Sequence, residues 1–235
     1  MGEKKRHVAI VLAAGKGSRM KSDIPKQYLI LNGKPVLYYA LRAFEDSFVD
    51  EIVLVTGAGQ ETYCKQEIVK KYGFQKVTYV IEGGKERYDS VYRGLCVLDR
   101  ADYVYIHDGA RPFIDDALLL RAKQNVAQYR ACAAGMPSKD TIKIIDEEGF
   151  VADTPQRKYT WTIQTPQVFE YSLIREAYEK MYRNMPEVQI TDDAMVAEHE
   201  TGVKIRFSEG SYRNIKITTP EDLVIAEAFL RENRE

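Results

Sequence analysis

The sequence predicts an α/β fold in which a mostly parallel sheet forms the middle of three layers, with helices on both faces. Strand-like and helix-like patches alternate over residues 7–137 of the 235-residue chain. The strand-like patches are almost continuous apolar runs, as expected of strands that are buried on both faces. The patches between them carry apolar residues at helical spacing, and this alternation is typical of parallel sheets covered by helices.

Five strands and five helices follow from these patterns. The expected strands are HVAIVLA (7–13), EIVLVTG (51–57), KVTYVIEGG (76–84), DYVYIHDGA (102–110) and ACAAGMP (131–137). The expected helices cover residues 35–46, 60–72, 86–99, 115–130 and 218–230. Pro35 and Pro220 suit the first positions of their helices, and Thr219 can cap the last one.

The alternation ends at a short hairpin. TIKII (141–145) and FVADT (150–154) predict two strands around the turn DEEG. We expect one domain over residues 1–235, with this hairpin as an arm over about 138–160. A lone hairpin is marginally stable in water, so it must pack on its own domain or on a second subunit.

Composition excludes several classes of protein. The net charge is −1 and 45% of residues are hydrophobic, which is ordinary for a globular protein and does not indicate a nucleic-acid or membrane partner. The three cysteines, Cys64, Cys96 and Cys132, are far apart and form no C-x-x-C pair, which favours a reducing cytoplasm over a disulfide framework. No run is long enough to span a bilayer.

Three polar clusters follow predicted strands and should meet at the carboxyl edge of the sheet, where such folds bind ligands. They are AAGKGSR, EGGKERYDS and HDGARPF. The first belongs to a loop that carries Lys16, Arg19, Lys21 and Lys26. Small residues let backbone N–H groups approach an anion, so this loop suits a polyphosphate. A tight turn with solvated lysines remains the alternative, since the loop matches neither the G-x-G-x-x-G fingerprint (Met20 takes the last position) nor a Walker A loop.

The ordered motifs together resemble one family. LAAGKGSRM with PKQ, GGKERYDSV (83–91), HDGARPF (107–113), KDTIK (139–143), QTPQVF (164–169), ITDDA (190–194) and GSYRNIKITTPEDL (210–223) are similar to the signature segments of 2-C-methyl-D-erythritol 4-phosphate cytidylyltransferases. The resemblance covers roughly residues 7–230. It implies a Rossmann-like, glycosyltransferase-A-like fold and a cytoplasmic enzyme of the non-mevalonate isoprenoid pathway.

The implied reaction joins CTP to a sugar-alcohol phosphate and releases pyrophosphate. The attacking phosphate is already largely dianionic at neutral pH, because its second pKa is about 6. No general base is therefore needed, and the enzyme must position two anions and neutralise developing charge. Mg²⁺ is the implied cofactor, held mainly by the CTP phosphates and not by a protein cage.

The resemblance also assigns roles to residues. The expected catalytic cations are Arg19, Lys26 and Lys216. The expected nucleotide-binding residues are Ala13, Ala14, Gly15, Gly84, Ser90 and Asp108. The expected substrate-binding residues are Asp108, Arg111, Thr141, Arg157 and Thr165. Thr141 and Arg157 flank the hairpin, which in this family reaches across a homodimer into the neighbouring site.

Some positions carry weaker expectations. Lys85 stands where some relatives have an acid, Lys16 and Lys21 are expected to be solvated, and His107 is expected to be structural. Asp192 and Asp193 are acids that could serve a metal or acid–base chemistry, but helix capping is favoured, with Thr191 as the natural N-cap.

Three other functions compete with the implied one. A ribitol 5-phosphate cytidylyltransferase uses the same chemistry, but such relatives tend to carry A-G-G and HDSVRP where this chain has A-A-G and HDGARP. A dinucleotide-dependent dehydrogenase is disfavoured by the imperfect glycine fingerprint. A non-catalytic nucleotide-binding protein would bind CTP without releasing pyrophosphate.

Overall fold

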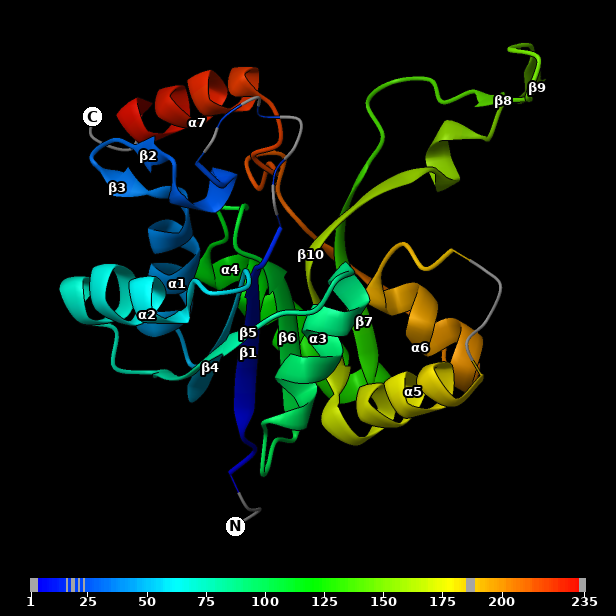
Figure 1. Cartoon of the computed structure of the whole chain (residues 1–235). Coiled ribbons are helices and arrows are strands. Elements are labelled where there is room, and N and C mark those ends of the chain that lie inside the picture. The colour runs from blue at the N-terminus through cyan, green and yellow to red at the C-terminus, as the bar shows by residue number, and fades with distance from the viewer. Residues whose placement is uncertain are drawn as a thin grey trace.

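A seven-stranded sheet forms the middle layer of the molecule in a computed structural model, which describes residues 4–15, 17, 20, 22, 24–184 and 189–232 (Figure 1). The order across the sheet is β11-β7-β10-β6-β1-β4-β5. These strands are β1 (His7–Ala13), β4 (Glu51–Thr56), β5 (Val77–Glu82), β6 (Tyr103–Asp108), β7 (Ala131–Pro137), β10 (Trp161–Glu170) and β11 (Arg206–Glu209).

Most neighbouring strands run parallel, which confirms the predicted sheet. β1 lies at the centre and pairs in parallel with both β4 and β6. β10 was not predicted; it runs antiparallel between β6 and β7, and β11 pairs in parallel with β7. The five predicted strands and the helices between them are present, with their ends within three residues of the expected positions.

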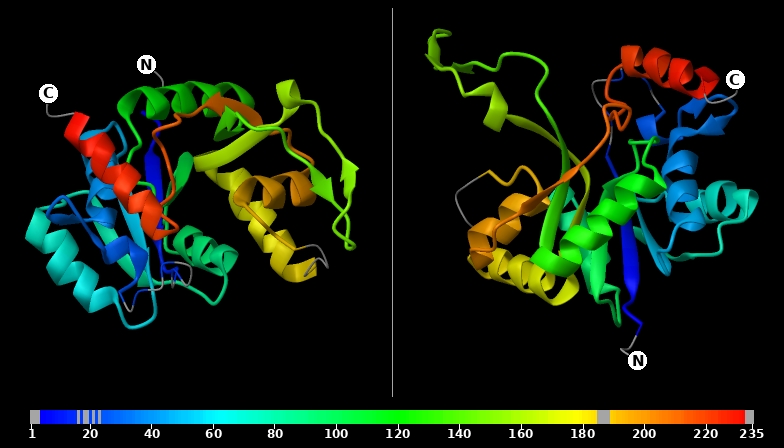
Figure 2. Two further views of the ribbon diagram at one scale, coloured as in Figure 1. Left: turned by 90° about the horizontal axis from the view of Figure 1, so that it is seen from above. Right: turned by 180° about the vertical axis from the view of Figure 1, so that it is seen from behind.

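Helices cover both faces of the sheet (Figures 1 and 2). One face carries α1 (Val36–Asp46), α2 (Glu61–Tyr63) with its π-helical continuation Cys64–Lys70, and α4 (Asp116–Tyr129). The other face carries α3 (Arg87–Cys96), α5 (Tyr171–Asn184) and α6 (Asp193–Thr201). β1 shows why both layers form, since Ala9 and Val11 pack in one core while Val8 and Ile10 pack in the other.

A third, smaller core lies at the carboxyl end of the sheet under α7 (Pro220–Glu232). Ala226 is buried there, with Leu223 and Leu230 packed against the same cluster. Pro220 opens the helix as expected. Pro35, in contrast, is the N-cap of α1 and belongs to a short hairpin of β2 (Ile30–Leu31) and β3 (Lys34–Pro35), because its backbone is extended.

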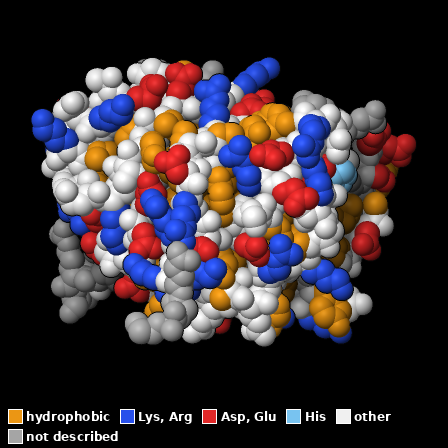
Figure 3. Space-filling view, turned by 90° about the horizontal axis from the view of Figure 1, so that it is seen from below, with side chains coloured by type: hydrophobic (Ala, Val, Ile, Leu, Met, Phe, Trp, Pro, Cys, Tyr) orange, Lys and Arg blue, Asp and Glu red, His pale blue; other side chains and the backbone are white. Residues whose placement is uncertain are grey.

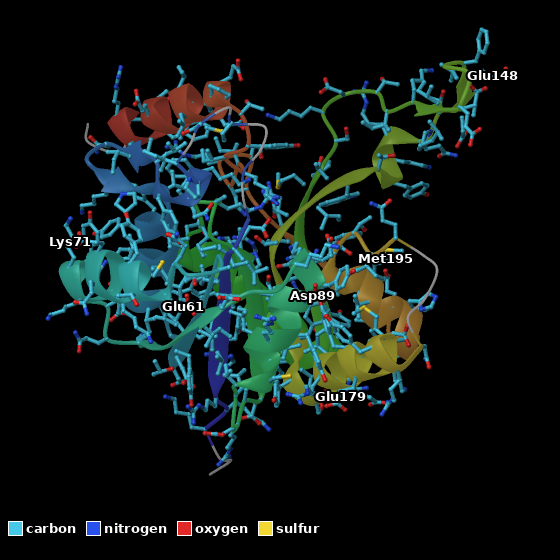
Figure 4. The ribbon with its side chains drawn as sticks, viewed as in Figure 1. Glu61, Lys71, Asp89, Glu148, Glu179 and Met195 are labelled. Atoms are coloured by element: carbon cyan, nitrogen blue, oxygen red, sulfur yellow. The ribbon has the colours of Figure 1, made fainter. Side chains whose placement is uncertain are left out.

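The predicted hairpin projects from the body as an arm, with Glu148 at its tip (Figures 1 and 4). Its strands are shorter than expected, β8 (Ile144–Ile145) and β9 (Val151–Asp153), and their register shifts between Ile144 and Ile145. Every residue of the two strands is exposed, so no packing extends the ladder. Among the described residues, none covers the apolar side chains of these two strands.

The face at the amino ends of the strands, opposite the carboxyl edge, intersperses Lys and Arg with Asp and Glu (Figure 3). It therefore shows no basic stripe of the kind that tracks a nucleic-acid backbone. In the part of the chain that the structure describes, no helix combines the length and apolar character needed to cross a membrane.

Candidate active site

Two cavities lie at the carboxyl edge of the sheet and share Arg87, Asp108 and Lys216. The first is lined by Leu12, Ala13, Ala14, Gly15, Lys26, Gln27, Gly84, Lys85, Glu86, Arg87, Ser90, Asp108, Ala110 and Lys216. The second is lined by Arg87, Asp108, Arg111, Ile163, Gln164, Thr165, Gln167, Thr191, Asp192 and Lys216.

The floor of the first cavity is the glycine loop after β1. Ala13, Ala14 and Gly15 line it together with Lys26, which opens the 3₁₀ helix Lys26–Tyr28. The next residue, Gln27, is buried and donates from Nε2 to the Ala13 carbonyl at 2.6 Å. This bond fixes the loop to the short helix, so Lys26 faces the same space as the loop backbone. Gln27 lies in the quoted PKQ motif, but its anchoring role was not predicted.

The opposite wall comes from the loop between β5 and α3. The Ser90 hydroxyl accepts from the Gly84 N–H at 3.1 Å and donates to the Glu86 carbonyl at 3.2 Å. A Cβ on Gly83 would lie 2.6 Å from the Ser90 hydroxyl and 2.7 Å from the Ala14 side chain. The backbone here therefore needs glycine to approach the first loop. Gly84 and Ser90 line the first cavity, and Ser90 shapes the loop that forms it.

Asp108 is the centre of charge where the two cavities meet. Its carboxylate lies 2.8 Å from Lys216 Nζ, 3.3 Å from Arg87 Nε and 3.8 Å from Arg111 Nε. Burial alone would raise the pKa of the Asp108 carboxyl, but Arg87, Lys216 and Arg111 hold that pKa well below its ordinary value. Asp108 is thus an ionised acceptor that keeps three cations in place.

Arg87 belongs to the GGKERYDS segment and lines both cavities, but no role was predicted for it. It opens α3, and its two Nη atoms bind both carboxylate oxygens of Asp193 at 2.9 and 2.8 Å. The Tyr178 hydroxyl donates to Asp193 at 2.7 Å, and both Asp193 and Tyr178 are fully buried. Although burial would lower the pKa of Arg87, Asp193 and Asp108 raise it well above its ordinary value.

The expected helix capping is confirmed for Asp192, but it is wrong for Thr191 and Asp193. The N-cap of α6 is Asp192, not Thr191, because the Asp192 carboxylate accepts from the Met195 N–H at 2.9 Å. Thr191 instead points its hydroxyl toward the Met195 sulfur. Asp193 does not cap the helix, since its carboxylate forms the buried pair with Arg87. The ITDDA motif alone could not show that a cation from α3 lies opposite.

The second cavity is rich in hydrogen-bonding groups. Arg111 donates from Nη1 to the Asn214 carbonyl at 2.8 Å, and its Nε–H has no hydrogen-bond partner among the described residues. Thr165 precedes a cis peptide bond to Pro166 and lies nearly buried at the cavity wall. Gln167 donates to Asp192 at 2.8 Å and accepts from the Ala194 N–H at 2.8 Å. This cavity can bind an anion at Arg111 and hydroxyl groups along its polar wall.

The remaining predicted residues lie elsewhere. Thr141 and Arg157 line neither cavity; both are exposed on the arm, where Arg157 Nη2 donates to the Thr141 hydroxyl at 3.2 Å. Arg19, with Lys16 and Lys21, lies outside the described residues. Lys85 is exposed at the rim of the first cavity, and His107 is fully buried.

Metal binding by the protein alone is not evident at this edge. Among residues 4–15, 17, 20, 22, 24–184 and 189–232, no group of three or more His, Cys, Asp or Glu side chains could hold a metal ion. A divalent ion bound here would need most of its ligands from another molecule. Phosphate oxygens and water are the ligands that Mg²⁺ prefers in such sites.

Comparisons with known proteins agree with one another. The family model of 2-C-methyl-D-erythritol 4-phosphate cytidylyltransferase (IspD) matches residues 7–232. The 2-C-methyl-D-erythritol 4-phosphate cytidylyltransferase of Lachnoclostridium phytofermentans is 52% identical over 227 residues, covering 97% of each chain. That of Lachnospira eligens is 51% identical, covering 96% of this chain and 99% of its own.

Solved structures show the same likeness. The 4-diphosphocytidyl-2C-methyl-D-erythritol synthase of Anaerococcus prevotii superposes with a TM-score of 0.84 at 36% identity, covering 97% of this chain and 96% of its own. The 2-C-methyl-D-erythritol 4-phosphate cytidylyltransferase of Thermus thermophilus gives a TM-score of 0.77 at 29% identity, covering 94% and 98%.

Proposed function

The chain belongs to the 2-C-methyl-D-erythritol 4-phosphate cytidylyltransferase family, and we propose that it transfers a cytidylyl group from CTP to 2-C-methyl-D-erythritol 4-phosphate and releases pyrophosphate. It is a nucleotidyltransferase of isoprenoid biosynthesis. The observation that carries the proposal is the pair of cavities that share Arg87, Asp108 and Lys216. Two substrates bound in these cavities would meet at one cluster of charge.

The first cavity is assigned to CTP. Its glycine loop offers backbone groups to phosphates, and Lys26 and Lys216 line it from two separate segments of the chain. The narrow wall of Ala13, Ala14 and Gly84 would favour a pyrimidine over the larger purine. Arg19 is expected to join the cations on the triphosphate, as the family resemblance implies.

The second cavity is assigned to the acceptor. Arg111 suits the phosphate, because a guanidinium can bind two oxygens at once. Thr165, Gln167 and Asp192 offer polar groups to the hydroxyls of the polyol. Asp108 lies between the two substrates and keeps Lys216, Arg87 and Arg111 oriented toward them.

The chemistry is an in-line displacement at phosphorus. A phosphate oxygen of the acceptor forms a bond to the α-phosphorus of CTP as the bond from that phosphorus to the bridging oxygen of pyrophosphate breaks. The acceptor phosphate carries the electron pair without deprotonation by a side chain, since its second pKa is about 6. Lys26 and Lys216 stabilise the charge that develops on the phosphoryl oxygens.

Mg²⁺ is the proposed cofactor. It would lie on the CTP phosphates beside Lys26 and Lys216 and supply charge neutralisation there. The protein's own part is to hold the phosphates in line.

A homodimer is the proposed assembly, and the cytoplasm the proposed location. The arm exposes the apolar side chains Ile142, Ile144, Ile145, Phe150, Val151 and Tyr159. An exposed apolar patch of this kind is typical of an interaction surface. Because Thr141 and Arg157 line neither cavity of their own chain, they are proposed to complete the acceptor cavity of a second copy.

The proposal is tested by pyrophosphate release from CTP and Mg²⁺, with 2-C-methyl-D-erythritol 4-phosphate and ribitol 5-phosphate assayed in parallel. Release with the first acceptor is expected. Equal or faster release with ribitol 5-phosphate would transfer the assignment to the sister activity. CTP binding without release with either acceptor would indicate a nucleotide-binding protein.

Lys216→Met provides the residue-level test. Loss of one preorganised cation should cost ~100-fold or more in turnover. Lys71→Met is the matched control, because Lys71 follows the π-helical segment Cys64–Lys70, lines neither cavity and pairs with Glu67 (Figure 4). Near-normal turnover of the Lys216 variant would remove that residue from the site.

A further inference from the structure

His107 lies behind the second cavity and has no part in the reaction described above, yet both of its ring nitrogens contact residues of the site. Nδ1 lies 3.1 Å from the Thr165 hydroxyl, and Nε2 lies 3.1 Å from the Arg111 carbonyl. The Thr165 hydroxyl also accepts a hydrogen bond from the Asp108 N–H at 3.0 Å. The ring is fully buried and packs edge-on against Phe44. Three site residues therefore meet around one imidazole.

These contacts determine where each hydrogen lies. The Arg111 carbonyl can only accept, so Nε2 of His107 must carry the hydrogen. In a neutral ring Nδ1 is then the acceptor, and the Thr165 hydroxyl must donate to it. The same Thr165 oxygen accepts from Asp108, and no contact is left mismatched. Burial also lowers the pKa of His107 to about 4, which keeps the ring neutral at physiological pH.

We propose that His107 is a positioning residue of the acceptor site, which fixes the Thr165 hydroxyl and the Arg111 carbonyl through its two ring nitrogens. The proposal rests on the assignment of the second cavity to the acceptor phosphate. The single hydroxyl hydrogen of Thr165 is donated to His107. Thr165 can therefore only accept, and not donate, a hydrogen bond when the sugar-alcohol phosphate binds. The donor to the phosphate is instead the Arg111 guanidinium, which lines the second cavity.

His107 also holds the turn that presents Arg111. The Arg111 N–H donates to the Asp108 carbonyl at 2.9 Å, and its own carbonyl is held by the ring. Both bonds restrict the backbone from which the guanidinium extends. A loosened turn should lower affinity for the acceptor more than affinity for CTP, because Arg111 and Thr165 line the second cavity and not the first.

Two variants separate the halves of this network. In His107→Asn the side-chain oxygen can replace Nδ1 and accept from Thr165, whereas in His107→Gln the side-chain N–H can reach toward the Arg111 carbonyl. Loss of the Arg111 bond in His107→Asn should raise the KM for the acceptor by ~5–10-fold, with the KM for CTP changed less than ~2-fold. His107→Gln should raise the acceptor KM less. The exposed His199→Asn is the matched control and should change neither KM.

A purely structural role predicts a different pattern. Both variants would then weaken CTP and acceptor binding together, in proportion to their loss of thermal stability, and that result would overturn the proposal. Equal acceptor KM values for His107→Asn and His107→Gln would also overturn it.

The hydrogen positions are measured without substrates. A ¹H–¹⁵N correlation spectrum of the wild-type imidazole resonances at about pH 7 should show His107 as the neutral Nε2–H form. The Nδ1–H form or a charged ring would contradict the network. This spectrum stands apart from the proposed function, because inactivity of the wild type with 2-C-methyl-D-erythritol 4-phosphate would remove that function and leave the hydrogen positions as measured.

Discussion

His107 and Asp108 are neighbours on β6, and their side chains lie on opposite faces of the sheet in opposite electrostatic environments. Asp108 faces Arg87, Lys216 and Arg111, which lower the pKa of its carboxyl despite burial. His107 lies in the core, where burial lowers the pKa of its ring to about 4. At physiological pH one strand end therefore holds a negative charge toward the substrates and a neutral ring toward the interior.

The depressed pKa of His107 predicts a pH dependence of stability. In the unfolded chain the ring titrates near 6.5, and in the native state it titrates at about 4. Between these values the unfolded state binds more protons, so protonation favours unfolding. The contribution of the neutral His107 ring to the free energy of unfolding is complete above pH 6.5 and is lost as the pH falls toward 4. The free energy of unfolding should fall by about 1 kcal/mol per pH unit in this window on account of His107 alone.

Urea unfolding of the wild type and of His107→Leu at a series of pH values measures this effect. The variant should have a shallower pH dependence between pH 4 and 6.5, whatever its absolute stability. Burial also lowers the pKa of His7, and that contribution remains in both proteins, so the difference between the two slopes isolates His107. Parallel curves would show that His107 does not titrate in this way.

At the scale of elements, Arg87 joins α3 to α6 and to the end of β6. Its partner Asp193 is fully buried, whereas about 29% of the Arg87 side chain is exposed. The two halves of the pair should therefore respond differently to substitution. Arg87→Ala leaves a buried carboxylate with Tyr178 as its remaining partner and should cost ~3–5 kcal/mol of unfolding free energy. Asp193→Ala should cost less, because Arg87 keeps Asp108 and partial access to water.

A double-mutant cycle measured by urea unfolding tests this asymmetry. The double variant should lose less unfolding free energy than the two single variants lose together, since the two side chains contact each other directly. Tyr178→Phe is the control for a lost hydrogen bond without a lost charge and should cost ~1–2 kcal/mol. Equal costs for Arg87→Ala and Asp193→Ala would contradict the asymmetric burial.

The elements that were predicted from sequence are those with a simple hydrophobic period. β1, β4 and β6 are apolar runs, and α1, α3 and α4 have clear stripes. β10 was missed because its middle residues are polar and nonetheless buried: Gln164, Thr165 and Gln167 are hydrogen-bonded to distant groups. Such burial depends on partners from other elements, which periodicity cannot show. α5 was not predicted either, although it carries an ordinary apolar stripe of the kind that predicts a helix.

The site residues also divide into those that could be predicted from the sequence and those that could not. Motif position alone placed Lys26, Asp108 and Lys216, and the structure brings all three to the first cavity. Arg87 and Asp193 lie 106 residues apart in sequence, and each resembles an ordinary surface charge at the start of a helix. Their pairing appears only when α3 and α6 pack on the same face of the sheet. A resemblance that names contact residues does not identify the buried partners that hold them.

At the scale of the whole molecule, the arm is the feature that one chain does not explain. Arg157 and Thr141 contact each other in the open, and the apolar side chains of the hairpin face solvent. Both cavities are lined by residues of the body, and no residue of the arm (138–160) lines either one. If two copies exchange arms, each acceptor cavity combines a body from one chain with Arg157 from the other.

A shared site predicts complementation between two defective variants. Arg157→Ala damages only the arm, and Lys216→Ala damages only the body. A heterodimer of the two contains one site in which an intact body meets an intact arm. Random exchange of subunits at equal concentrations should thus restore about a quarter of the wild-type activity per chain, measured as pyrophosphate release at low acceptor concentration.

The outcome distinguishes the two places where the arm can act. Each variant alone should remain defective under the same conditions, and Lys71→Ala mixed with Lys216→Ala should give only the average of its two components, because Lys71 belongs to neither arm nor cavity. If the mixture of Arg157→Ala and Lys216→Ala has only the average activity of these two variants, each arm serves its own body. Recovery above the average requires a site built from two chains, since no single chain in the mixture carries both an intact arm and an intact body.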